Sequence, residues 1–560
     1  MKKIKFIVPI LALAFFSCDN YLDINSPSPN DISFSQASPS KLLPGAQTSC
    51  YRVQGTTMNQ LGNVFMNSWT RNVQSWGNGY DKELQLNLDT GFYNSGTLSI
   101  VSGSTGLASL IKNFQAIIDY PNPDGKYDNY VAAAKICKVH YVQQLVDLYG
   151  DIPYTEAWKG TGNITPKYDD DYAIYQSLFG ELQQARDLIS NAPATAEDIA
   201  PYDVMLKGDL AKWTEFANTL QLRMCLRMSA VTGAKATLRD QKLADLSTII
   251  NNGGSFITAN VVVNPGFNSS TDDQASPAFG TFAYLVSGNL QNNRTFVTMS
   301  GHAYKALQSY ATTNWAAFGN NYEIVAGSGI NYPNVLDPRS AKLFTLGSGQ
   351  TVRRAVTQGS NVVDVTTPAG TLPGLPCRLG LAGNFNLYGQ AAGGTLPEYF
   401  ACDGYVMTLS ESYFLQAEAA LRYPALFSGA QAAFDNGVTE DFTMRNATIG
   451  TYLSLINAKP NFGYTASTTT AQKLHAIMYQ KWIALMGVNA IQSYLDYTRT
   501  GFPVTPLPLG ALVQNKKPNR LMYPTAEYVA NSANVPNMVA ADCFSLNSHT
   551  PFWVPGAPQN

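Results

Sequence analysis

The chain has 560 residues and a formal net charge of −2 at neutral pH. Charged residues make up only 14% of the sequence, against about 25% in a typical soluble protein. This charge balance excludes a broad basic surface for nucleic acid or anionic lipid. Tyrosine (31) and tryptophan (7) supply apolar rings with a polar tip, which suit recognition of neutral ligands in water.

The N-terminus has the pattern of an export signal. Three lysines in the first five residues precede an apolar run, Phe6–Phe16, followed by Ser17 and Cys18. The run fits a signal-peptide core of about 7–15 residues and is too short to span a bilayer, which takes about 20. A small residue before cysteine is typical of lipoprotein processing, although Phe15 and Phe16 depart from the usual aliphatic pattern. We therefore predict a signal peptide at 1–17, lipid attachment to Cys18 and an extended linker over 18–40; an ordinary secretory signal is the alternative.

The next 200 residues are predicted to be helical, over 41–254. The clearest case is 131–150, where apolar residues recur at 3.6-residue spacing and Gly150 is placed to end the helix. Asp169, Asp170 and Asp171 precede the next pattern as a run that is typical of a solvated helix cap. Further helices are predicted over 169–191, 205–231 and 238–252.

The composition of the sequence changes at residue 255. Up to about 400, Gly, Asn, Thr and Pro are dense, and one short helix is plausible near 300–312. A block of this length is expected to hold irregular structure and short strands packed on the helical body. Helical patterns return over 405–423, 427–447, 470–486 and 488–498, with a tail to 560. We predict a mostly α fold in which 41–560 is one body of tetratricopeptide-like helix pairs with an irregular, loop-rich, ligand-facing insertion.

The sequence carries no motif of a cofactor or metal site. Four histidines, His140, His302, His475 and His549, lack the spacing of a helical zinc site, and we expect His140 and His475 to be structural. Neither a nucleophile elbow nor a phosphate-binding loop occurs. No cofactor and no metal are predicted, although a pair of catalytic carboxylates cannot be read from sequence alone. Among the cysteines, Cys377 and Cys402 are the first pair to test for a disulfide.

Aromatic residues cluster in two polar, glycine-containing segments. The first is 67–80 and the second is 300–322. Rings in such segments do not follow an amphipathic helix face, so some are candidates for solvent-facing platforms on which sugars stack. The alternative is that they belong to the core. The candidate ligand-binding residues are Trp69, Trp76, Asn78, Tyr80, Tyr304, Trp315 and Tyr322.

Several segments in order resemble the SusD/RagB family of nutrient-binding outer-membrane lipoproteins of Bacteroidota. The resemblance begins at CDNYLDINSPSPND and LLPGAQ, and its most specific piece is LYGDIPYTEA (148–157). Within these motifs, Gly150 and Asp151 read as a helix end and its turn, and Arg499 with Gly501 as a turn with an ion pair. The other matching segments are WTEFANTLQLRMCLRMS, DPRSAKLF, ESYFLQAEAALR, QKWIALMGVNAIQSYLDYTRTGFP and NRLMYPTAEYVAN.

The resemblance implies a function as well as a fold. Family members are binding proteins rather than enzymes, and they form a lid over a SusC-like TonB-dependent barrel in the outer membrane. It implies capture of oligosaccharides, or in some cases peptides, on the irregular face, with the helical pairs mostly toward the barrel. We therefore expect a surface-exposed, lipid-anchored glycan-binding protein. A peptide-binding member of the family is the alternative, followed by an exported glycan-degrading enzyme and a scaffold without a small ligand.

Overall fold

The computed structural model describes much of the chain from residue 37 to 558. The signal peptide, Cys18 and the linker as far as residue 36 lie outside the described residues, so their predicted roles stay predictions. Within 37–558, the structure leaves out 74, 76–78, 94–99, 101–105, 160–161, 309–329, 347–352, 361–365, 368–369, 372–376, 383–384, 387–394, 510 and 512–513.

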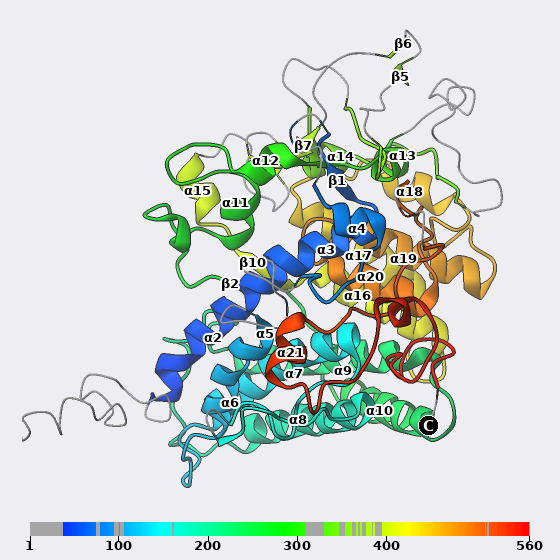
Figure 1. The fold of residues 1–560 in the computed structure, drawn as a ribbon. Coiled ribbons are helices and arrows are strands. Elements are labelled where there is room, and N and C mark those ends of the chain that lie inside the picture. The colour runs from blue at the N-terminus through cyan, green and yellow to red at the C-terminus, as the bar shows by residue number, and fades with distance from the viewer. Residues whose placement is uncertain are drawn as a thin grey trace, which may run out of the picture.

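The described chain begins with a helical rod that crosses the molecule diagonally (Figure 1). It consists of α2 (Pro39–Val53), a π-helical turn (Gln54–Met58) and α3 (Asn59–Phe65). Every residue of α3 is buried, although four of its seven residues are Asn, Gln or Gly. With so few apolar residues, α3 is hard to recognise from apolar spacing in the sequence. Its Asn and Gln side chains can be buried because they form hydrogen bonds inside the protein rather than with water.

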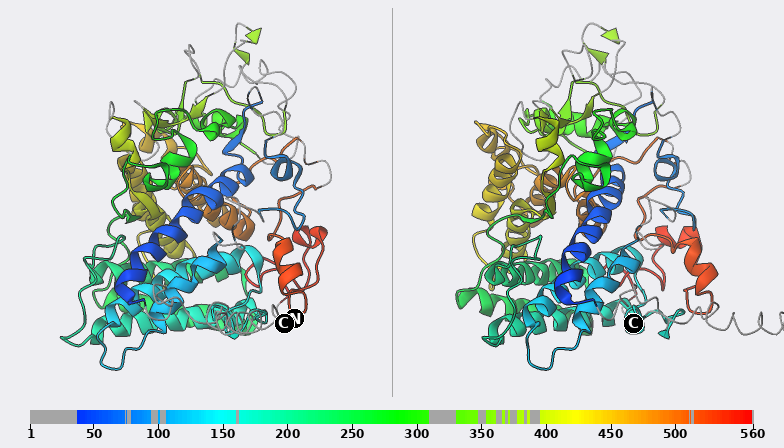
Figure 2. Two further views of the ribbon diagram at one scale, coloured as in Figure 1. Left: turned by 60° about the vertical axis from the view of Figure 1, so that its left-hand side comes forward. Right: turned by 90° about the vertical axis from the view of Figure 1, so that its left-hand side faces the viewer.

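Each long helix packs against the long helix next to it in sequence, as predicted. The contacts join α7 with α8, α9 with α10, α16 with α17, and α19 with α20 (Figure 2). The mostly helical fold of paired helices is therefore confirmed. Their bounds are α7 Asp128–Tyr149, α8 Asp171–Asn191, α9 Leu210–Arg227, α10 Gly233–Asn251, α16 Leu409–Arg422, α17 Ala430–Met444, α19 Thr470–Leu485 and α20 Ala490–Thr500.

Helix α9 joins the N-terminal and C-terminal sets by packing on both α7 and α16. Arg227 on α9 lies 3.0 Å from Asp147 on α7 and 3.6 Å from Asp496 on α20. Arg499, as its motif suggested, makes an ion pair, here with Glu418 on α16 at 2.8 Å, and Gly501 ends α20 with φ +75°. Buried charged pairs of this kind fix which helices meet, because a misplaced partner would leave an uncompensated charge.

The block at 255–400 is irregular, as predicted, and its strands occur in two-stranded sheets. Strand β2 pairs with β10, β4 with β7, β5 with β6, and β8 with β9, while β3 pairs with β1 from the N-terminal region. The bounds are β1 Trp69–Arg71, β2 Val261–Val263, β3 Val297–Met299, β4 Phe344–Thr345, β5 Thr366–Thr367, β6 Gly370–Thr371, β7 Arg378–Leu379, β8 Leu381–Ala382, β9 Phe385–Asn386 and β10 Gly404–Met407.

Short helices complete the described chain. None of the described helices combines the length and apolar character needed to cross a bilayer. They are α4 Asp81–Gln85, α5 Leu107–Leu110, α6 Lys112–Ile118, α11 Pro277–Phe282, α12 Asn292–Phe296, α13 Gly301–Leu307, α14 Ser340–Leu343, α15 Leu396–Phe400, α18 Tyr452–Asn457 and α21 Thr525–Ala530; 3₁₀ turns occupy Met228–Ala230, Asp272–Gln274 and Ala540–Phe544.

The start of one predicted helix was wrong, and the cysteine pair named for testing is not bonded. The predicted helix over 405–423 begins only at Leu409, because Gly404–Met407 pairs as a strand and Thr408 caps the helix by accepting from the Glu411 amide. Cys377 and Cys402 are both buried free thiols rather than a disulfide. The Cys377 sulfur accepts from the Arg354 amide at 3.1 Å, and the Cys402 thiol lies 3.2 Å from the Ser276 hydroxyl.

Candidate functional site

Strand pairing brings the described starts of the two predicted aromatic segments together at one end of the molecule. Trp69 in β1 faces Met299 in β3, and the Ser300 amide donates to the Ser68 carbonyl at 3.1 Å. Beyond the strands, the Asn72 side-chain amide donates to the Thr295 carbonyl at 2.8 Å. The described parts of the two segments, up to residue 73 and over 300–308, therefore start from the same small sheet, beside α12, α13 and α14 (Figure 1). We call this region the β1–β3 face.

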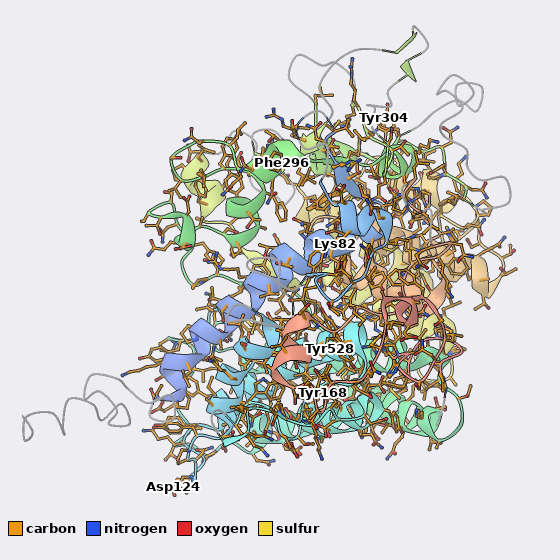
Figure 3. All side chains as sticks on the ribbon, in the orientation of Figure 1. Lys82, Asp124, Tyr168, Phe296, Tyr304 and Tyr528 are labelled. Atoms are coloured by element: carbon orange, nitrogen blue, oxygen red, sulfur yellow. The ribbon has the colours of Figure 1, made fainter. Side chains whose placement is uncertain are left out.

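Three of the candidate ligand-binding rings belong to the interior of this face. Trp69 is 1% exposed, and its indole makes an edge contact with Phe282 at 5.3 Å. Tyr80 and Tyr304 are 4% and 9% exposed; Tyr304 lies at the upper end of the molecule in Figure 3. In this conformation these rings support the face rather than present a platform to solvent. Trp76, Asn78, Trp315 and Tyr322 lie outside the described residues, so ligand contact by them stays a prediction.

Beneath the β1–β3 face lie buried basic groups that the sequence analysis did not single out. Burial, with nearby Lys517 and Lys305, lowers the pKa of His302 to about 3, so this ring is neutral; its Nδ1 lies 2.9 Å from the Tyr332 hydroxyl. Burial also lowers the pKa of Lys517 to about 7 and that of Arg294 to about 10. Within the described chain, Arg294 and Lys517 make no ion pair with a carboxylate.

A network of five residues attaches the irregular block to the helical body. Arg339, from the motif DPRSAKLF, makes ion pairs with Asp337 at 2.7 Å and with Asp441 on α17 at 2.8 Å, and it donates to Gln480 on α19 at 2.8 Å. Asp441 also pairs with Arg445 at 2.8 Å. Arg339, Asp337, Asp441 and Arg445 are all buried. The motif is thus a structural tether, and its carboxylates are held by arginine.

The remaining carboxylate group of interest is Asp151, Asp170 and Asp171, one oxygen from each lying within 4.8 Å of the others. Asp170 caps α8 by accepting from the Ala173 amide at 2.8 Å, as predicted for this run. Asp171, however, is buried rather than solvated and accepts from the Phe552 amide at 2.8 Å. Burial, and then the Asp151 charge, raises the pKa of Asp171 to about 7. These residues could hold a cation by composition, but their hydrogen bonds already give them a structural role.

The two histidines expected to be structural are confirmed as such. His140 is fully buried and lies 3.0 Å from both the Gln54 side chain and the Arg223 guanidinium. Burial, and then the Arg223 charge, lowers the pKa of His140 well below its ordinary value. His475 packs on Phe462 at 5.6 Å and on Phe502 at 5.1 Å.

The described chain is a body of paired helices that carries an irregular face built on short sheets, and comparison with known proteins assigns its family. The model of the SusD-like family, described as starch-binding and associating with the outer membrane, matches residues 29–282 and 367–524, which is more than half of the chain. The chain belongs to the SusD-like family.

Solved structures share the fold over nearly the whole chain. A chitin-binding SusD homologue from Flavobacterium johnsoniae has 18% identity and a TM-score of 0.64, covering 92% of this chain and 99% of its own. A SusD homologue from Bacteroides thetaiotaomicron has 19% identity and a TM-score of 0.63, covering 93% and 100%. One from Bacteroides uniformis has 19% identity and a TM-score of 0.62, covering 94% and 100%. No curated protein matches this chain.

Proposed function

We propose that this chain is a lipid-anchored, surface-exposed protein that binds oligosaccharides on the β1–β3 face and delivers them to a SusC-like TonB-dependent transporter. The observation that carries the proposal is the pairing of β1 with β3, which joins the described starts of the two aromatic segments at one end of the molecule. The family description, starch-binding and associating with the outer membrane, supports a glycan ligand and this location. The chitin-binding relative from Flavobacterium johnsoniae supports the same ligand class.

The proposed mechanism is capture followed by closure. Trp76 and Trp315 would stack on sugar rings, while the core residues Trp69 and Tyr304 hold the two segments in register. The lipid on Cys18, with the linker to residue 40, would tether the lid near the barrel while allowing it to open. Hydrolysis would be left to separate enzymes, and no cofactor takes part.

Calorimetry of the full chain tests ligand class and site together. We expect binding to maltooligosaccharides or chitooligosaccharides, and weakening by roughly 1–3 kcal/mol in Trp76→Ala or Trp315→Ala without loss of folding. Tyr202→Ala is the matched control, because Tyr202 is a 45% exposed ring on the helical body. Unchanged affinity in both tryptophan variants would refute the site. Binding only to a peptide panel would favour the peptide-binding alternative, and release of reducing sugar would favour an enzyme.

Two further measurements test the anchor and the partner. Cys18→Ala should abolish incorporation of labelled palmitate and release the protein from membranes, whereas Cys50→Ala, a buried thiol, should leave both unchanged. Affinity purification from outer membranes in mild detergent should recover a large β-barrel protein. Its absence would count against the transporter partnership while leaving glycan binding intact.

A further inference from the structure

A separate pocket lies in the helical half of the molecule, beside α21 and the start of α5. It has a volume of about 240 Å³, and Tyr168, one of its walls, is labelled in the lower half of Figure 3, far from the upper end with Tyr304. Its lining residues are Ala108, Ser109, Leu145, Tyr149, Ile152, Pro153, Ala157, Trp158, Ile164, Pro166, Tyr168, Tyr523, Glu527, Ala530 and Asn531. We call it the α21 pocket.

Rigid aromatic rings form its walls. Tyr523 stacks near Tyr149 at 6.3 Å and makes an edge contact with Tyr168 at 5.3 Å. Trp158 is held in the left-handed region at φ +61°, and its indole N–H donates to the Ala108 carbonyl at 2.6 Å. A bulky residue adopts this conformation only where its surroundings impose it, which is more frequent at binding sites than elsewhere. The pocket is therefore preformed rather than adaptable.

Polar groups around the α21 pocket are mostly occupied. The Tyr523 hydroxyl donates to the Asp151 carbonyl at 2.7 Å, and the Tyr168 hydroxyl donates to Glu527 at 2.8 Å. The Asn531 amide donates to the Pro166 carbonyl at 2.7 Å, and its oxygen accepts from Asn534 at 2.8 Å. A sugar would find few free groups for its hydroxyls here, and unpaired hydroxyls are costly to bury. An apolar or aromatic group fits this lining better.

Two exposed aliphatic residues occur at or near the pocket, one in its lining and one on the helix that borders it. Ile164 on the rim is 77% exposed, and Val529, next to the lining residue Ala530, is 78% exposed. They are the two most exposed large hydrophobic residues in the described part of the chain. A small ligand inside the pocket would leave them in water, whereas a protein surface would cover them, and such apolar patches around a concave centre are typical of protein interfaces.

The charge of Glu527 indicates which kind of residue a partner would place next to the α21 pocket. Glu527 is the only charged residue that lines the pocket, and it is partly exposed. Its carboxylate accepts from Tyr168 but makes no ion pair with a lysine or arginine within the described residues. A partner that carries a basic residue next to its apolar anchor would complement this rim electrostatically.

We propose that the α21 pocket is a protein-docking site, distinct from the glycan-binding face. It receives one aromatic or large aliphatic side chain of a partner polypeptide, while an adjacent lysine or arginine of that partner pairs with Glu527. The partner surface around the anchor covers Ile164 and Val529. The site requires no movement of the helical body, because its walls are already in place.

Fluorine NMR of the full chain labelled with 5-fluorotryptophan tests the proposal directly. Trp158→Phe assigns the Trp158 resonance among the seven tryptophans. Titration with N-acetyl-tryptophanyl-lysine amide should shift that resonance with a Kd on the order of millimolar, the range for a fragment of an interface. N-acetyl-seryl-lysine amide should not shift it. Absence of a shift with the tryptophan peptide, or an equal shift with the serine peptide, would overturn the proposal.

Variants separate the anchor from the charge. Ala530→Phe, which fills the pocket, should weaken binding at least about tenfold, whereas Ala526→Phe on the same helix, outside the lining, should leave it unchanged. Glu527→Gln should weaken the lysine peptide about twofold to fivefold and leave N-acetyl-tryptophanyl-glycine amide unaffected. Equal effects of the two alanine variants would overturn the site. A Trp158 shift with chitooligosaccharide and none with peptide would instead make it a second glycan subsite.

Discussion

The helical body and the β1–β3 face reach a fixed structure by different means. Helices of the body run to 22 residues, as in α7, whereas the longest helix described within 255–400 has seven, in α13. Long helices bury a continuous apolar surface, so their stability is spread over many contacts. Short helices and two-residue strands bury too little to fold alone and depend on their attachment to other segments.

A few polar attachments hold the face in place. The Gln358 side-chain amide donates to the carbonyls of Val64 at 2.8 Å and Trp69 at 2.7 Å, and the Ser300 hydroxyl donates to the Asn67 carbonyl. With the Arg339 network, these bonds fix the base of the face to the helical body. This division between body and face lets a binding surface vary in sequence without loss of the scaffold that supports it.

The largest effect is expected where the two regions are joined. Asp441→Asn removes the carboxylate shared by Arg339 and Arg445, leaving two buried guanidinium groups undercompensated. We expect the free energy of unfolding to fall by about 3–5 kcal/mol, because breaking a buried pair exposes the full desolvation penalty of the remaining charge. Denaturant unfolding followed by circular dichroism measures the change.

The matched control for Asp441→Asn is Glu440→Gln, on the same helix and partly exposed. This variant should change the free energy of unfolding by less than about 0.5 kcal/mol. A similar loss of unfolding free energy in both variants would show that removing any charge from α17 is destabilising. The network around Arg339 would then contribute no more to stability than an exposed charge.

Most of the helical body could be predicted from the sequence, because its signals are local. Apolar spacing located α7, α8 and α19 within three residues at either end. The rod α2–α3 was not resolved as individual helices. In α3, Asn59 donates to the Gly487 carbonyl at 2.8 Å, and Asn63 accepts from the Gly487 amide at 3.1 Å. These partners lie more than 400 residues away in sequence, so a local pattern cannot reveal them.

The candidate site was predictable only as two segments. Their glycine and asparagine content separated them from the helices, but exposure of each ring depends on long-range pairing. Trp69 is buried because β1 pairs with β3, and the local sequence of 67–80 does not predict that pairing. The α21 pocket was missed for the same reason, since its walls come from segments around 149–168 and 523–531.

The buried Asp171 carboxyl should make the stability of the helical body depend on pH. Because the pKa of Asp171 is raised from 3.8 to about 7, the folded state retains a proton there that the unfolded state loses. Stability from this group is therefore present at low pH and falls as pH rises from about 4 to about 7. Asp171→Asn should stabilise the protein by up to about 4 kcal/mol at pH 8.

Unfolding midpoints of Asp171→Asn and the parent protein at pH 5, 6, 7 and 8 provide the measurement. The gain should grow with pH up to about 7 and then level off. Asparagine can still accept the Phe552 amide, so the main bond is kept. A gain that does not depend on pH would mean that packing rather than ionisation separates the two proteins.

The close packing of the rod against the body gives a smaller, steric prediction. A Cβ on Gly62 would lie 2.2 Å from the backbone carbon of Ala490 at the start of α20. Gly62→Ala should therefore destabilise the protein by about 1–3 kcal/mol, as overpacking does. Gly45→Ala, in the same rod with nothing within 4 Å, should instead stabilise by up to about 1 kcal/mol through helix propensity. Thermal unfolding of the pair would contradict the packing argument if both variants gained stability.

The smallest effect separates the two roles of neighbouring aspartates. Asp170→Asn keeps the cap on α8, because asparagine caps as well as aspartate, so alone it should change the free energy of unfolding by only a few tenths of a kcal/mol. It also removes a negative charge that raises the pKa of Asp171. The gain from Asp171→Asn at pH 8 should then be smaller in the Asp170→Asn background than in the parent, a coupling that a double-mutant cycle measures. Strict additivity would mean that solvent screens Asp170 from its buried neighbour, so that burial and the Asp151 charge raise the pKa of Asp171 without it.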